Sequence, residues 1–324
     1  MKRVSERIAN HHHAHRTNNN LISHFSFLIP HFLCLILLLF SCKTIPDNHI
    51  APDVSGFVPL EPGAAAYVFA DVKNVRPIIN NINIKELESK QVKTMLDLTD
   101  YAMVAVFPRQ DSRVFQVNAQ GDYPTFKAKI GLGINKDWKK MRSASAKSVY
   151  WYSEKNGLSL AVNQRQTVVY APSENIPVDP YSASARTELK VPDGFSEFRS
   201  DAVLSCWLEK ADVIINKKLN EMGIPLEIPA EMLFLCLFPA DSYDSNEDQL
   251  YEVNLSLQFD NASQAMAFSM LFSLARNFYI PGDNDVIASI LFANPVVQDG
   301  INLDIKSSAL SAAEIALLLN SFLL

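Results

Sequence analysis

A nine-residue apolar block near the N-terminus decides which part of this chain has to fold. The block, Phe32–Phe40, falls well short of the roughly 20 apolar residues that span a bilayer, and it fits the core of a cleavable export signal. The residues before it carry four basic side chains against one acidic side chain, which is the positive flank of such signals. We therefore expect residues 1–41 to be removed, leaving a folded body that is exported.

The block ends in Leu39-Phe40-Ser41-Cys42, a small residue followed by a cysteine. This run resembles the relaxed lipobox of spirochaete-type bacterial lipoproteins, with Phe40 where a small or β-branched residue is usual. The resemblance implies cleavage before Cys42 and a fatty acid such as palmitate on Cys42. It also implies a cell-envelope location with the outer membrane favoured, either at the periplasmic face or at the surface. The alternative is an ordinary secretory signal that is cleaved elsewhere, and no motif of the body assigns it to a characterised family.

The expected mature chain is acidic. Removing residues 1–41 leaves 29 − 4 = 25 basic and 35 − 1 = 34 acidic residues, a formal charge of −9. Nucleic-acid binding needs clustered lysine and arginine, so no nucleic-acid partner is expected. Attraction to anionic lipid is weak for such a chain as a whole, and membrane attachment falls to the acyl chains on Cys42.

Histidine is almost confined to the leader, which argues against an enzyme. Six of the seven histidines precede Cys42, and the seventh, His49, follows it closely. A Ser–His–Asp triad, a Cys–His pair and His-ligated zinc are therefore excluded from the folded body. The chain has no nucleotide-binding glycine motif and no nucleophile-elbow motif. We expect no catalytic residues, no metal and no cofactor; a hydrolase that uses carboxylates alone is the remote alternative.

The order of expected elements indicates an α+β fold with antiparallel sheets and helices packed on one face. After a lipidated tether over residues 42–63, strand–helix–strand–strand–helix–strand is predicted in residues 64–172. A Pro-rich linker follows in residues 173–200, and the same order returns in residues 201–324. In both units a strand ends in proline, at Pro108 and at Pro239. The chain is therefore expected to hold two repeated α+β domains.

Several helices have clear sequence signals. Asn261 is expected to cap a helix over Ala262–Tyr279, and Ser311 with Glu314 predicts a capping box for a last helix over Ala312–Leu323. Both helices are very apolar. Each can insert into a bilayer surface or hold an acyl chain, or it can pack on a sheet and be covered by neighbours.

The segment Thr125–Met141 is the main candidate for an external contact. Phe126, Ile130, Ile134 and Trp138 recur at helical spacing, which predicts one amphipathic helix with an apolar face. Basic residues that include Lys139 and Lys140 flank this face. A basic helix that carries tryptophan is typical of membrane-surface or partner-binding elements. The alternative is a core-facing helix with a solvated basic side.

Cys206 and Cys236 are the other cysteines of the mature chain, and each lies in an apolar run that predicts a buried strand. Export makes a disulfide between neighbouring strands feasible. Reduced thiols in the core are the alternative, since free cysteine is a common small core residue.

Together these features predict a lipid-anchored, non-enzymatic binding or structural module at the membrane surface, with another envelope protein or lipid as its partner. The second hypothesis is a lipoprotein whose amphipathic helices insert into the outer membrane, perturb it or bind lipid.

Overall fold

The structure is a computed structural model. It describes residues 60–82, 90–107, 113–144, 148–155, 157–162, 166–172, 179–180, 191–195, 201–221, 226–243, 249–278, 290, 294–307 and 309–323. The expected signal peptide, Cys42 and His49 lie outside these residues.

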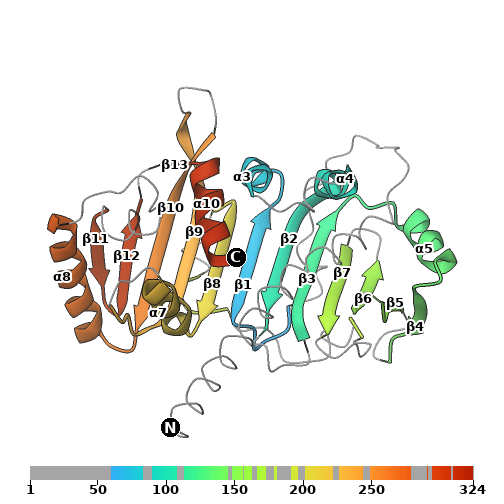
Figure 1. Ribbon diagram of the computed structural model, residues 1–324, viewed down its shortest axis with the longest axis horizontal. Helices are drawn as coiled ribbons and strands as arrows, with labels where there is room; N and C mark the ends of the chain where they lie inside the picture. Colours follow the sequence, from blue (N-terminus) through green and yellow to red (C-terminus); the bar gives the residue numbers. More distant parts are fainter. Residues whose placement is uncertain are drawn as a thin grey trace, which may run out of the picture.

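One antiparallel sheet runs through the described part of the chain (Figure 1). Its strand order is β11-β12-β10-β9-β8-β1-β2-β3-β7-β6-β5-β4, with β13 paired to β10. The strands are β1 (Ala66–Asp71), β2 (Thr99–Val106), β3 (Arg113–Gly121), β4 (Lys139–Arg142), β5 (Val149–Ser153), β6 (Leu158–Val162), β7 (Gln166–Pro172), β8 (Leu204–Glu209), β9 (Ala230–Tyr243), β10 (Gln249–Phe259), β11 (Val296–Asp299), β12 (Asn302–Lys306) and β13 (Leu310–Ser311).

The strands β1 and β8 join the two halves of the chain. They pair antiparallel over five residue pairs, from Ala66 with Leu208 to Ala70 with Leu204. The sheet is therefore continuous: a strand that precedes the expected linker in the sequence is hydrogen-bonded to a strand that follows it. The mixed, antiparallel α+β class expected from the sequence is confirmed, whereas the repeat of one unit in two domains stays a prediction.

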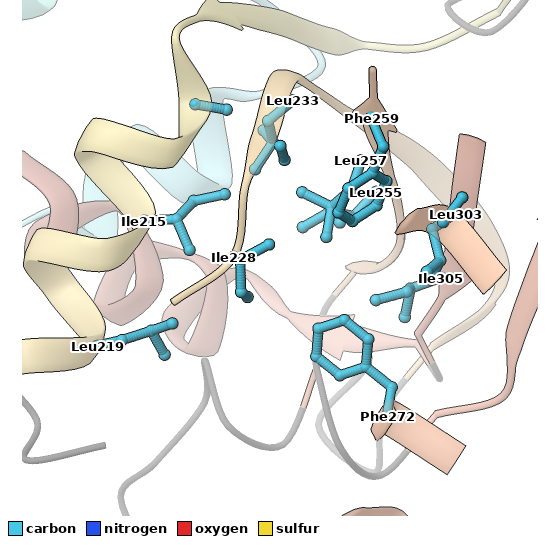
Figure 2. Packing of buried hydrophobic residues seen from close by; sticks show 13 residues of the cluster. Ile215, Leu219, Ile228, Leu233, Leu255, Leu257, Phe259, Phe272, Leu303 and Ile305 are labelled. Carbon is cyan, nitrogen blue, oxygen red and sulfur yellow. The ribbon is translucent and has the colours of Figure 1, made fainter. Parts of the chain in front are cut away.

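Helices cover one face of this sheet. They are α3 (Arg76–Asn81), α4 (Lys90–Leu98), α5 (Thr125–Ile134), α7 (Ala211–Glu221), α8 (Ala262–Phe278) and α10 (Ala312–Leu323). One core cluster joins α7 and α8 to β9, β10 and β12, and Figure 2 shows Ile215, Phe272 and Ile305 directed into it. A second cluster joins α3 and α10 to β9 and β10. Because the side chains of a strand alternate between faces, the register places both clusters on one side of the sheet.

The opposite face has an aromatic centre. Tyr67, Trp207 and Phe234 are cross-strand neighbours on β1, β8 and β9, and all three are buried. The Tyr67 ring stacks on Trp207 with 4.5 Å between ring centroids. Leu60, Ala64 and Phe195, which come from short non-strand segments, close this cluster. This opposite face is therefore covered at its centre by pieces of chain from far apart in the sequence.

Both predicted helix caps are confirmed. The Asn261 side chain accepts a hydrogen bond from the Gln264 amide at 3.0 Å, so it caps α8. At α10, Ser311 Oγ accepts from the Glu314 amide at 3.2 Å, while the Ser311 amide donates to the Glu314 carboxylate at 2.7 Å. This reciprocal pair satisfies backbone donors that a helix start would otherwise leave open.

Of the two possibilities for Cys206 and Cys236, the structure has the reduced thiols and not the disulfide, because both cysteines are free. In the register of β8 and β9, Cys206 lies opposite Leu235 and Cys236 lies opposite Ser205. Adjacent residues of a strand point to opposite faces, so the two sulfur atoms lie on different sides of the sheet. Burial, and to a smaller extent the neighbouring Cys236, raises the pKa of the Cys206 thiol to about 12. Both cysteines are reduced core residues.

Candidate functional site

The helix predicted over Thr125–Met141 is shorter in the structure. Helix α5 ends at Ile134, and Lys139 and Lys140 lie on the edge strand β4. The Asn135 side chain accepts a hydrogen bond from the Asp137 amide at 2.9 Å, which turns the chain away from the helix axis. Trp138 follows this turn and is only 6% exposed, so its assignment to an external contact is wrong.

Helix α5 turns its larger apolar side chains outward. Phe126 is 77% exposed and Ile134 is 76% exposed, with Ile130 between them also exposed. Its inner face consists of Ala128 and Leu132, which pack on the sheet. At about 100° per residue the outer and inner faces are centred about 180° apart. The alternative of a core-facing stripe at Phe126, Ile130 and Ile134 therefore does not hold, and these three residues are called the α5 patch below.

Basic side chains surround the α5 patch. Lys127 and Lys129 flank it on the two sides of the helix, and both are exposed. Lys136, Lys139, Lys140 and Arg142 continue the basic rim beyond the helix, all of them exposed. Within residues 122–142 six basic residues stand against two acidic ones, Asp122 and Asp137. This end of an otherwise acidic body is positively charged.

The layer beneath α5 contains buried hydrogen-bond donors that have no acceptor. Trp138 and Trp151 are buried there, and neither indole N–H has a hydrogen-bond acceptor among the described residues. A buried donor without an acceptor costs about 1–3 kcal/mol. The residue before the helix, Pro124, makes no side-chain cap, and the helix contains two glycines, Gly131 and Gly133. Helix α5 is thus held by a small inner face over a layer in which two indole N–H groups lack an acceptor.

Helix α8 lies at the opposite end of the sheet from α5 (Figure 1). Its outer face is also apolar, and its members are called the α8 patch: Met266, Met270, Leu271 and Leu274. Its inner face is larger than that of α5, because Ala265 and Phe272 are fully buried and Phe268 stacks on Phe259 at 5.3 Å. Arg276 is the one charged residue within α8. The two ends of the sheet therefore carry apolar patches that differ in charge and in anchoring.

A pair of carboxyl groups lies close to the start of α8. The side chains of Glu231 and Asp260 are hydrogen-bonded, and this bond together with the charge of Asp260 raises the pKa of Glu231 above its ordinary value. Both residues are exposed, and Asp260 directly precedes the capping residue Asn261. Within the described residues no group of three or more possible metal ligands comes together. None of the helices described in the structure combines the length and the apolar character that crossing a bilayer requires.

Sequence and structure comparisons identify the relatives of this chain. The family described as "Outer membrane-associated lipoprotein TP0453" matches residues 53–290, which is 238 of the 324 residues. A search among curated proteins finds no match.

Solved structures of TP0453 have the same fold. Crystal form III has a TM-score of 0.56 at 19% identity, with 81% of this chain and 98% of that chain covered. Crystal form IV has a TM-score of 0.56 at 18% identity, with 82% and 98% covered. Crystal form I has a TM-score of 0.53 at 19% identity, with 81% and 95% covered.

The family description agrees with the location expected from the lipobox. A lipid-anchored protein of the cell envelope, with the outer membrane favoured, is confirmed at that level. The description names a membrane-associated lipoprotein and no enzymatic activity, so the absence of catalysis stays a prediction. The match spans more than half of the sequence, from the expected tether to a point beyond α8. The chain therefore belongs to the TP0453 family of outer membrane-associated lipoproteins.

Proposed function

We propose that this lipoprotein is held in the outer membrane by a fatty acid on Cys42 and contacts the lipid surface directly through the α5 patch, whereas the α8 patch binds a second apolar partner. The observation that carries the proposal is the outward face of α5. Phe126, Ile130 and Ile134 expose more apolar surface than Ala128 and Leu132 bury. A soluble helix normally does the reverse.

The basic rim supports lipid as the partner of the α5 patch. An amphipathic helix at a membrane interface combines an apolar face with lysine and arginine that meet anionic headgroups. Each basic residue near an anionic surface contributes about 1 kcal/mol. Lys127 and Lys129 flank the patch, so apolar burial and headgroup attraction act in the same orientation of the helix.

The α8 patch supports a second, related role. Its methionine and leucine side chains have one charged neighbour within their own helix, Arg276. Methionine-rich faces adapt to irregular apolar partners. The α8 patch therefore suits another envelope protein or an acyl chain, which is the binding-module function expected from the sequence.

A flotation experiment tests the lipid contact without the anchor. Residues 43–324, made without the signal and the acylated cysteine, are mixed with vesicles that contain an anionic phospholipid. We expect the body to float with the vesicles, and Ile134→Asp to reduce the floated fraction strongly. Val213→Asp is the matched control, because Val213 is also an exposed β-branched residue on a helix, α7. A body that stays wholly unbound would refute the proposal.

A separate experiment tests the anchor. Cys42→Ala should abolish labelling of the full chain by a fatty-acid probe in cells that process lipoproteins. Undiminished labelling would contradict the assignment of Cys42.

A further inference from the structure

We infer that the α8 patch binds the α5 patch of a second copy of this chain, so that two copies pair through two such contacts. The inference rests on the proposed function, which gives the α8 patch an apolar partner, and it adds which partner and which of its surfaces. Lipid and α8 then compete for the same α5 patch. The pair is a state of the chain away from a membrane.

Both patches lie on the same side of the sheet. An unbroken row of cross-strand partners connects Trp151 and Leu160, beneath α5, with Leu255 and Ile305, beneath α8. Partners directly opposite each other on neighbouring strands share a face of the sheet. The two helices lie at opposite ends of that face (Figure 1). A two-fold axis that brings α5 of one copy to α8 of the other therefore also brings α8 of the first to α5 of the second.

The two patches match in spacing. The three residues of the α5 patch follow one another at intervals of four, and the α8 patch contains a row with the same interval, Met266, Met270 and Leu274. Each row is about 12 Å long at 1.5 Å per residue. Rows with this interval fit into each other's grooves when two helices pack. Small exposed residues beside the rows, Gly133 on α5 and Ala267 on α8, allow the two helices to approach closely.

Charges near the ends of the two helices select an antiparallel contact. When the middle residues of the two rows are opposed, Lys136 of one copy lies about 6 Å along the axis from Asp260 of the other. Arg276 then lies within about 3 Å of the level of Asp122. All four side chains are exposed. A parallel contact would instead bring Asp122 toward Asp260 and Lys136 toward Arg276, which are pairs of like charge.

Net charge favours α5 with α8 over the pairing of either helix with its own copy. Residues 122–142 have an excess of basic residues. The start of α8 is acidic: a hydrogen bond to Asp260 and the charge of Asp260, with a smaller effect of Asp212, raise the pKa of Glu231. Two α5 patches would bring the lysines of their rims against one another. Two α8 patches would leave those rims in solvent, so the mixed contact is the one in which charges complement each other.

Each contact is small, so the pair is transient. Three apolar side chains of α5 meet four of α8, which is less than a standard protein interface. We expect a dissociation constant of roughly 10–100 μM for the two contacts together. Dilute solutions of the chain therefore contain monomers.

Sedimentation velocity of residues 43–324, without lipid, tests the pair. The parent should shift from monomer to dimer between about 1 and about 200 μM. Ile134→Asp and Met270→Asp should each weaken pairing by at least about 30-fold, because each places a charge in both contacts. Val297→Asp is the matched control and should pair like the parent, since Val297 is 62% exposed and lies in the row of Phe234 on the opposite face.

Circular dichroism checks that the variants keep the fold, as expected for exposed positions. A parent that stays monomeric throughout this range would overturn the inference. So would a folded Ile134→Asp or Met270→Asp variant that pairs like the parent.

Disulfide trapping identifies the surfaces that meet. Ile130→Cys and Met270→Cys each add one thiol at an exposed position of its patch. In a mixture of the two variants under mild oxidation, the disulfide between positions 130 and 270 should form at least about tenfold faster than any disulfide in either variant alone. Trapping of position 270 with its own copy at the same rate would overturn the inference.

A charge exchange tests the antiparallel direction. Lys136→Glu and Asp260→Lys should each weaken pairing about tenfold, because each change occurs in both contacts. Both changes in one chain should restore pairing to within about threefold of the parent. A double variant that pairs more weakly than either single variant would overturn the antiparallel contact.

Flotation separates the pair from the lipid contact. A chain that floats with anionic vesicles but never pairs would overturn this inference alone, whereas one that pairs but never floats would refute the lipid contact alone. When anionic vesicles are added to the mixture of cysteine variants, trapping between positions 130 and 270 should fall strongly, because lipid occupies the α5 patch. Undiminished trapping on protein that has floated would overturn the competition.

Discussion

Helices α5 and α8 lie at opposite ends of one sheet, and each has two apolar faces. They differ in how those faces are balanced. Helix α8 buries Phe272 and Phe268 and leaves a neutral face outside, whereas α5 buries only Ala128 and Leu132 and leaves Phe126 and Ile134 outside within a basic rim. An outward apolar face is thus compatible with firm packing in one helix and with a weak hold in the other. The size of the inner face decides how firmly each helix is packed on the sheet.

The largest expected difference between the two ends is in stability. Phe272→Ala should lower the free energy of unfolding by about 3–5 kcal/mol, because it empties a fully buried aromatic site beneath α8. Leu132→Ala beneath α5 should cost about 2–3 kcal/mol, since so small an inner face can settle onto the sheet. Urea unfolding followed by circular dichroism measures both. A larger loss for Leu132→Ala would reverse the comparison.

The next effect concerns charge. Replacing Lys127 and Lys129 by glutamine should weaken binding to anionic vesicles by about 2 kcal/mol, or roughly 30-fold, and leave binding to neutral vesicles unchanged. Arg276→Gln in α8 is the control and should cost no more than about fivefold. Titration with vesicles at low salt measures these affinities. If the double substitution at Lys127 and Lys129 and the substitution Arg276→Gln weakened binding to anionic vesicles equally, the basic rim would not distinguish the α5 end of the sheet from the α8 end.

A smaller effect is expected from the carboxyl pair at the start of α8. Because the pKa of Glu231 is raised in the folded protein, the folded state binds a proton more tightly than the unfolded state does. Stability from this group is therefore present below the ordinary glutamate pKa and is lost as the pH rises through the folded pKa. Glu231→Gln should remove this dependence and raise stability at pH 7 by less than about 0.5 kcal/mol, since the pair is exposed.

Thermal unfolding between pH 4 and pH 7 checks that prediction. The melting temperature of the parent should fall with rising pH relative to that of Glu231→Gln. The same slope in both proteins would show that this carboxyl pair has no part in it.

The smallest effect should come from the outward faces themselves. Phe126→Ala and Met270→Ala remove side chains that are 77% and 65% exposed, so each should change the free energy of unfolding by no more than about 0.5 kcal/mol. Denaturant titration of the two variants in the absence of lipid provides the measurement. A loss above about 1.5 kcal/mol in either variant would mean that its patch is covered in solution.

Local sequence signals located most elements correctly. The capping box at Ser311 and Glu314 and the cap at Asn261 act over three residues, so they do not depend on the rest of the fold. The helical spacing of Phe126, Ile130 and Ile134 likewise predicted a helix where α5 lies. The same spacing continued to Trp138 and failed there, because the turn at Asn135 ends the helix.

Contacts between segments far apart in the chain could not be predicted from the sequence. Cys206 and Cys236 each lie in a buried strand as predicted, yet the pairing register of β8 and β9 places them on opposite faces. A shift of one residue would have placed them on the same face, and nothing in either apolar run specifies which register forms. Leu60 and Glu61 are likewise packed on the sheet although the sequence assigned them to the tether, because Gln116, the hydrogen-bond partner of Glu61, is 55 residues away along the chain.

The sequence alone predicted an export signal and a body without catalytic residues, and it located most of the strands and helices, since each of these depends on composition or on neighbours a few residues apart. The tertiary structure decided which apolar face of α5 is inward and on which faces of the sheet Cys206 and Cys236 lie. A helical stripe has the same spacing whether it meets a core or a membrane. Its direction is set by strands from elsewhere in the chain, and only their assembly turns Ala128 and Leu132 toward the sheet and Phe126 away from it.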